Sequence, residues 1–172
     1  MDVEQLRFPA GDAIPNNPRL PALAYRGVLA GRAAEAERVF TGNGWGGTWR
    51  STVLPYHHFH STSHEALGVA AGRATLALGG PQGHELQVSA GDVLVLPAGT
   101  GHKRVDSSDD FLVVGAYPRG QEGYDLLRGD PAELEEAVAN IERVALPATD
   151  PVDGENGPLV ELWGARYRSP SK

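Results

Sequence analysis

The sequence predicts a single, mainly β domain, a closed antiparallel barrel or sandwich with an N-terminal arm and one or two flanking helices. Glycine (22 residues) and proline (13 residues) recur between short apolar stretches, a pattern typical of short strands joined by turns. Between residues 45 and 117 the apolar positions follow the period of two that strands show. The sequence has neither an internal repeat nor a linker, so we expect residues 1–172 to form one domain.

Composition and charge exclude several classes of function. Hydrophobic residues make up 41% and charged residues 22% of the chain, the balance of a folded globular domain. The net charge of −7 and the pI of about 5.3 argue against a nucleic-acid partner, which needs a basic surface. No apolar run is long enough to span a membrane, and the first residues do not resemble a signal peptide. We therefore expect a cytoplasmic protein without nucleic-acid or membrane partners.

Residues 1–44 precede the predicted barrel and contain an arm and a helix. Three prolines within residues 14–21 prevent a helix there, and we expect this segment to lie extended across the outside of the body. Residues 32–43 have apolar positions spaced by three and four, which predicts a helix that ends at Gly44.

The barrel itself is expected over about residues 45–118. Residues 73–78 and 85–88 predict a hairpin around the glycine-rich turn 79–83, and residues 93–96 and 111–117 are near-continuous apolar runs that suit strands covered on both faces. Gly68 and Gly72 predict bulges or sharp bends. Such a sheet usually closes on itself because open strand edges invite aggregation.

Residues 119–172 predict one more helix and a final strand. Asp130 and Pro131 form a helix start, with Glu133 at the capping-box position. The helix carries an apolar stripe of Leu134, Ala137, Val138 and Ile141. The tail, residues 157–163, is interpreted as a strand.

Because cysteine is absent, any bound metal must be held mainly by nitrogen and oxygen ligands, and four of the six histidines fall within residues 56–65. Side chains two apart on a strand share a face, so His58 and His60 are expected to point together into the barrel, while His57 and Phe59 point away. His64 precedes an acidic residue and is expected to point the other way, as a residue behind the ligands or on the surface.

Glu65 and His102 complete the predicted metal site. The four residues after His60 suffice for a turn that returns Glu65 on a neighbouring strand, and His102 follows the turn 97–101, which closes an apolar strand. Three neutral imidazoles and one carboxylate suit one divalent ion such as Fe, Mn, Ni, Co, Cu or Zn and leave part of an octahedral shell free.

These residues lie in two motifs that resemble those of the cupin superfamily. Residues 58–72 read H-x-H-x4-E-x6-G, which matches the first motif after its opening glycine, replaced here by Thr52. Residues 91–102 read G-x5-P-x-G-x2-H and fit the second motif, whose final asparagine is Asp106 here. The resemblance implies a double-stranded β-helix, or jelly-roll, barrel. Together with the long arms at both ends, it also implies a homodimer.

The resemblance extends to small bacterial single-domain cupins of the YjlB-like group. The similar segments are residues 14–21, 60–69, 96–104 and the Leu-Trp pair at 162–163, so the likeness spans nearly the whole chain. It implies the fold and the metal ligands far more than it implies a reaction.

Two further residues are candidates for catalysis. Tyr56 is in phase with the two strand histidines and projects either into the cavity, as an acid or base, or into the core. Arg104 is in phase with His102 and either anchors a substrate anion or forms an internal ion pair with Asp106 or another acid.

The open coordination shell leaves two classes of function. The first is a small metal-dependent enzyme, an oxygenase or a related lyase or isomerase, acting on a small polar molecule. The second is a module that binds or senses a small ligand without chemistry.

Overall fold

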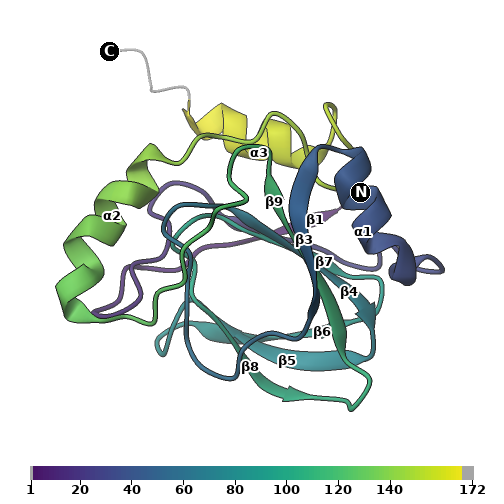
Figure 1. The fold of residues 1–172 in the computed structure, drawn as a ribbon, viewed down its shortest axis with the longest axis horizontal. Coiled ribbons are helices and arrows are strands. Elements are labelled where there is room, and N and C mark those ends of the chain that lie inside the picture. Colours follow the sequence, from purple (N-terminus) through teal and green to yellow (C-terminus); the bar gives the residue numbers. More distant parts are fainter. Residues whose placement is uncertain (1, 168–172) are drawn as a thin grey trace.

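The computed structural model describes residues 2–167, and the side chains of residues 2–164. Within this range, nine strands form two antiparallel sheets (Figure 1). The larger sheet has the order β1-β2-β7-β4-β9-β3, with strands β1 (Val3–Leu6), β2 (Ala22–Tyr25), β3 (Trp45–Ser51), β4 (Glu65–Ala71), β7 (Val93–Leu96) and β9 (Leu112–Pro118). The smaller has the order β6-β5-β8, with strands β5 (Arg73–Leu78), β6 (His84–Ser89) and β8 (His102–Ser107).

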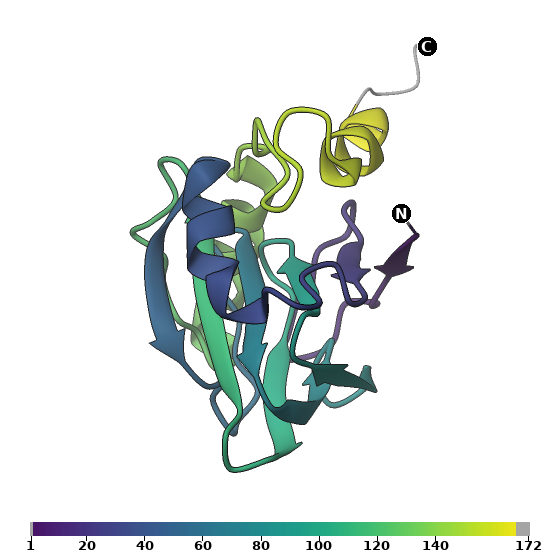
Figure 2. The ribbon, with the colours of Figure 1, turned by 90° about the vertical axis from the view of Figure 1, so that its right-hand side faces the viewer.

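Three α-helices flank the sheets. They are α1 (Ala36–Gly42), α2 (Leu134–Arg143) and α3 (Pro158–Tyr167), and short 3-10 turns at Ala33–Glu35 and Pro131–Glu133 precede the first two. In Figures 1 and 2, α1 and α3 lie at the opposite end of the molecule from the three-stranded sheet. Across the described residues, every helix is too short or too polar to cross a membrane.

The central strands of the large sheet are buried on both faces, as predicted. In β7, Val93 and Val95 belong to the core shared with α1 and α3, whereas Leu94 and Leu96 belong to the core between the two sheets. The period of two along one strand therefore supplies both cores, because successive side chains point to opposite faces. This layered antiparallel architecture confirms the predicted mainly β fold with flanking helices.

Helix α1 packs directly on β4 at Gly68. A Cβ atom at Gly68 would lie 2.9 Å from both Ala36 Cβ and the Phe40 ring, so a glycine is needed for this close approach. The predicted bulge or bend does not lie at Gly68 itself, which pairs in register, but between Val69 and Ala71 in the same strand. The expectation holds at Gly72, where a φ of +74° turns the chain from the large sheet into the small one.

The N-terminal segment is built into the fold and does not cross its outside, so that prediction is wrong. Strands β1 and β2 extend the large sheet at one edge, and the segment between them buries Ile14 and Asn16. Figure 2 shows these strands, in purple, at the side of the sheet. The Asn16 side chain donates to the Gly79 carbonyl and accepts from the Gly101 N–H, both at 3.0 Å. The segment without regular structure is thus fixed by side-chain hydrogen bonds that no local pattern indicates.

Helix α2 lies close to where the sequence predicts it, and its apolar stripe differs in one position. The Asp130 carboxylate accepts the Ala132 N–H at 3.0 Å, as an N-cap residue does. Ala137 and Ile141 are buried, but Val138 is 42% exposed and lies outside the packed face.

The C-terminal segment is helix α3, so the predicted strand is wrong. Leu159 and Trp163 are four residues apart, share one face of the helix and are buried in the core. The start of the helix is held by a side chain nine residues earlier, because the Asp150 carboxylate accepts the Leu159 N–H at 3.0 Å. Asp150 also accepts the Tyr25 hydroxyl at 2.7 Å, which ties this helix to β2. The apolar run thus follows the helical period once tertiary contacts fix its first turn.

Candidate metal centre

Two histidines of the candidate site come from the irregular segment between β3 and β4. Backbone hydrogen bonds join His58 to His102, the first residue of β8, in both directions (2.9 and 3.2 Å). Because this segment is extended, His58 and His60 share one side, as predicted, while Phe59 is buried on the other side among Ile14, Ala137 and Leu127.

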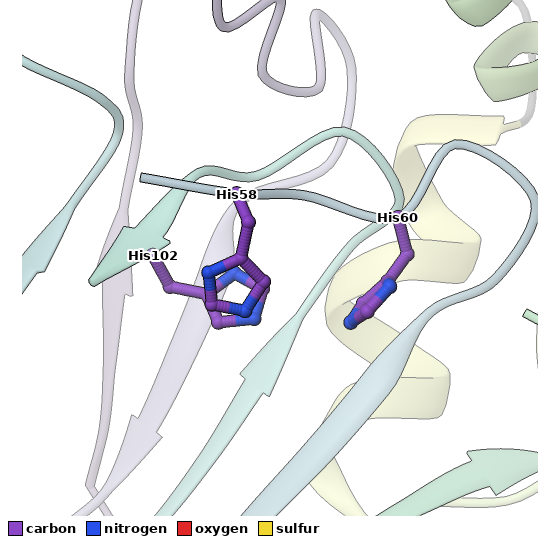
Figure 3. Close-up of side chains that lie close together, drawn as sticks. All are labelled: His58, His60 and His102. Atoms are coloured by element: carbon purple, nitrogen blue, oxygen red, sulfur yellow. The ribbon is translucent and has the colours of Figure 1, made fainter. Parts of the chain in front are cut away.

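The three imidazoles converge on one point. Ring centroids are 4.0 Å apart for His58 and His102, 5.5 Å for His60 and His102, and 6.0 Å for His58 and His60. One nitrogen from each ring lies within 4.8 Å of the others, and Figure 3 shows the His60 ring facing the adjacent rings of His58 and His102. All three side chains are buried. These residues could therefore hold one metal ion.

Backbone carbonyls fix the protonation of all three rings. The Nδ1–H of His58 donates to the Tyr56 carbonyl at 2.9 Å, and that of His102 donates to the Thr100 carbonyl at 3.0 Å. The Nδ1–H of His60 donates to the Asp125 carbonyl. A carbonyl only accepts, so each Nδ1 carries a proton, and in the neutral ring each Nε2 keeps a lone pair for a ligand.

Glu65, the first residue of β4, lies against two of these Nε2 atoms. Its Oε2 is 3.2 Å from His60 Nε2, and its Oε1 is 3.2 Å from His102 Nε2. Only 2% of Glu65 is exposed, and among the described residues Oε1 has no hydrogen-bond donor. A buried carboxylate beside imidazole Nε2 atoms needs a positive charge, which a proton on Nε2 or a metal ion in its place supplies, so the four residues fit a metal ion.

The pKa values reflect the same electrostatic arrangement. Burial raises the pKa of Glu65, but His60 and His102 lower it by more, and the net pKa lies well below the ordinary value. Burial lowers the pKa of His60, but Glu65 and the Asp125 carbonyl raise it above its ordinary value. Burial and His102 lower the pKa of His58 to about 3, so its ring is neutral at pH 7.

A hydrogen-bond chain holds the Glu65 carboxylate from behind. The Tyr117 hydroxyl donates to Glu65 Oε2 at 2.6 Å and accepts the Trp49 indole N–H at 2.8 Å. Burial and Glu65 raise the pKa of Tyr117 far above its ordinary value, so the hydroxyl keeps its proton. Gly115 leaves room for the Trp49 ring, since a Cβ there would lie only 2.1 Å from it. Sequence reasoning missed these hydrogen bonds because the register of β4 and β9, which places Tyr117 beside Glu65, has no local signal in the sequence.

A strap, defined here as residues 124–127, pairs with residues 59–62. Phe59 and Leu127 exchange two backbone hydrogen bonds of 2.9 Å. The Asp125 carboxylate accepts the Ser61 N–H at 2.6 Å and also the Ser61 hydroxyl, while its carbonyl holds His60. Sequence reasoning missed Asp125 as well, because it lies in a loop without a recognisable motif.

The four residues open into a pocket of about 180 Å³. Most of its wall is apolar or aromatic, and its lining residues are Trp49, Ser51, Thr52, Val53, Leu54, His58, His60, Glu65, Leu67, His102, Tyr117, Tyr124 and Leu126. At roughly 30 Å³ per water molecule, the space corresponds to about six waters. The site can therefore admit a small molecule beside a metal ion.

The other candidate residues lie outside this lining. The Tyr56 ring makes an edge contact with His58. The Arg128 guanidinium lies over the Tyr56 ring, 3.6 Å from its centre, in a cation–π contact. The Arg104 guanidinium donates to the Val53 carbonyl and the Ser107 hydroxyl, and no ion pair with Asp106 is present within residues 2–164. The catalytic roles of Tyr56 and Arg104 stay predictions.

His64 is buried behind the site, which is the first of the two positions expected for it and excludes the surface. Its Nδ1 accepts the Ala98 N–H at 2.9 Å, and its Nε2–H donates to the Ala145 carbonyl at 3.2 Å. Burial lowers the pKa of His64 to about 4. His57 is half-buried and not part of the cluster, in agreement with strand alternation.

Two comparisons with known proteins identify the family of this chain. The cupin domain family matches residues 50–114. The chain is also 45% identical over 156 residues to "Uncharacterized protein YjlB" of Bacillus subtilis (strain 168). The aligned residues make up 91% of this chain and 93% of that protein. The chain therefore belongs to the cupin superfamily, and YjlB is a relative over nearly its full length.

Solved structures show more distant likenesses. An acireductone dioxygenase from Bacillus anthracis with a cadmium ion is 16% identical, with a TM-score of 0.38, over 55% of this chain and 63% of that one. A Bacillus subtilis oxalate decarboxylase with Mn(II) centres is 19% identical, with a TM-score of 0.39, over 63% of this chain and 27% of that one.

Proposed function

We propose that the barrel binds one divalent transition metal ion through the Nε2 atoms of His58, His60 and His102 and the carboxylate of Glu65. The main support is the proton arrangement, because every Nδ1–H already donates to a backbone carbonyl. With the three rings neutral, three Nε2 lone pairs and a buried oxygen without a donor face one another. Fe, Mn, Ni, Co, Cu and Zn all suit this donor set.

We further propose that the centre is catalytic, as a small oxygenase or a lyase or isomerase for a small polar, enolisable molecule. A divalent ion in this position supplies Lewis acidity or activates dioxygen. The protein holds the carboxylate through Tyr117, and the pocket beside it has apolar walls that include Leu67 and Leu126. The proposal assigns no step to Tyr56 or Arg104, because neither lines the pocket.

A binding or sensing module is the alternative, and one observation favours it. Among the described lining residues, the only titratable groups are the four predicted ligands and two tyrosines. The Tyr117 hydroxyl is already committed to Glu65, which leaves few groups for general acid–base catalysis.

Activity of the metal-loaded protein separates these two functions. Samples loaded with Fe, Mn, Ni, Co, Cu or Zn are tested for oxygen consumption and for conversion of small carbonyl compounds, beside His60→Ala as the control. Turnover that is lost in His60→Ala supports the enzyme. Tight ligand binding without turnover in any metal form supports the binding module and contradicts the enzyme.

As part of the same proposal, the protein works in the cytoplasm as a homodimer. The family resemblance supports the homodimer. Light scattering that gives the mass of a single 18.2 kDa chain would contradict it.

A further inference from the structure

Charge in the pocket is confined to the predicted metal ligands. Within residues 2–164, no lysine, arginine or aspartate lines it, and Glu65 is its only acidic residue. The rest of the wall consists mainly of apolar or aromatic side chains, namely Trp49, Val53, Leu54, Leu67, Tyr124 and Leu126. A ligand that coordinates the metal at one end must therefore place its other end against an uncharged wall.

The two arginine side chains near the pocket do not line it and make other contacts. Arg104 Nε donates to the Val53 carbonyl at 3.1 Å, and the Arg128 guanidinium lies over the Tyr56 ring. A second anionic group on the ligand would lose its water without gaining a cation, which is strongly unfavourable in a small apolar space.

We propose that this pocket selects ligands with a metal-binding oxygen group at one end and an uncharged, mainly apolar group at the other. The inference rests on the proposed metal site and narrows its substrate class. It excludes small dicarboxylates and phosphorylated molecules, whose second charge has no partner here.

A matched pair of ligands tests this selectivity. 2-Hydroxy-4-methylpentanoate and malate have the same number of non-hydrogen atoms and share the hydroxy-carboxylate group, but the first ends in an isopropyl group and the second in a carboxylate. Dissociation constants are measured from the visible absorption of the cobalt-loaded protein. We expect the methylpentanoate to bind at least tenfold more tightly. Equal affinities, tighter malate or binding of neither would overturn the inference.

Cobalt content, measured before any ligand is added, separates the two proposals. Protein without bound cobalt contradicts the metal site, and the selectivity with it. Full cobalt occupancy without a preference contradicts the selectivity alone.

Leu126→Arg tests the missing cation directly. Leu126 lines the pocket and is 43% exposed, so the substitution is compatible with folding. We expect malate to bind at least tenfold more tightly to Leu126→Arg than to wild type. In Leu126→Gln, the uncharged control, the affinity for malate should stay as low as in the wild type. If Leu126→Gln gives the same gain, charge is not what the pocket lacks.

Discussion

At the scale of single residues, the role of a histidine depends on what its two nitrogens contact. His58, His60 and His102 each donate from Nδ1 to a carbonyl, which leaves Nε2 free. His64 uses both nitrogens, one to accept the Ala98 N–H and one to donate to a carbonyl. His64 therefore has no lone pair for a metal and serves as a structural link in the interior.

His64 should make stability depend on pH. Its pKa of about 4 in the folded state is below the ordinary 6.5, mainly because of burial, so between these values the unfolded chain binds a proton that the folded chain does not. Stability should therefore fall from pH 7 to pH 4, with His64 contributing about 3 kcal/mol of the loss, at roughly 1.4 kcal/mol per pKa unit. Urea unfolding of wild type and His64→Gln measures the difference. Parallel pH profiles would contradict this assignment.

Tyr117 should act on the metal through Glu65. Tyr117→Phe removes the hydrogen bond to Glu65 Oε2 and should weaken cobalt binding about tenfold, the usual effect of losing a group that orients a ligand. Tyr56→Phe is the matched control, since that ring lies outside the pocket lining. Equal cobalt affinities for the two variants would show that Tyr117 does not position the carboxylate.

At the scale of elements, local patterns predicted most strands but not how they meet. The alternation around His58 follows from the period of two, and the hairpin of β5 and β6 from its glycine-rich turn. By contrast, the contact of Tyr117 with Glu65 depends on register, and the strap depends on a long loop. Helix α3 is not predictable from its own pattern, because Asp150, nine residues before Leu159, holds its first turn and is itself tied to Tyr25 of β2.

The strap should contribute to metal affinity. Asp125→Ala removes the acceptors of the Ser61 N–H and hydroxyl and loosens the segment that carries His60, so cobalt affinity should fall 10- to 100-fold. Asp125→Asn keeps one acceptor oxygen and should recover part of the affinity. Asp130→Ala, which removes a helix cap elsewhere, should cost about 1 kcal/mol of stability and leave cobalt binding intact. An Asp125→Ala protein with wild-type affinity would disprove the role of the strap.

Asp150 should be the main anchor of helix α3. Its fully buried carboxylate accepts from the Tyr25 hydroxyl and from the N–H groups of Val152, Asp153 and Leu159. Asp150→Ala leaves these donors unpaired and should lower the free energy of unfolding by about 3 kcal/mol, measured by urea titration. Asp153→Ala, at an exposed neighbour, should have little effect. Similar losses in both variants would contradict this account.

At the scale of the whole molecule, the fold class was predictable because two separate signals agreed. Turn residues and the period of two indicated a mainly β domain, and the order of histidines and glycines resembled the cupin motifs. The paths of the two ends were not predictable. Asn16 and Asp150 fix these paths through long-range hydrogen bonds, which leave no periodic trace in the sequence.

The central claim is that this barrel holds a metal ion at His58, His60, Glu65 and His102. Elemental analysis of the purified protein beside His58→Ala and His102→Ala tests it most directly. We predict close to one equivalent of Fe, Mn, Ni, Co, Cu or Zn in the wild type and loss of that metal in both variants. No metal in any sample, even after anaerobic reconstitution, or equal metal in all three, would contradict the claim.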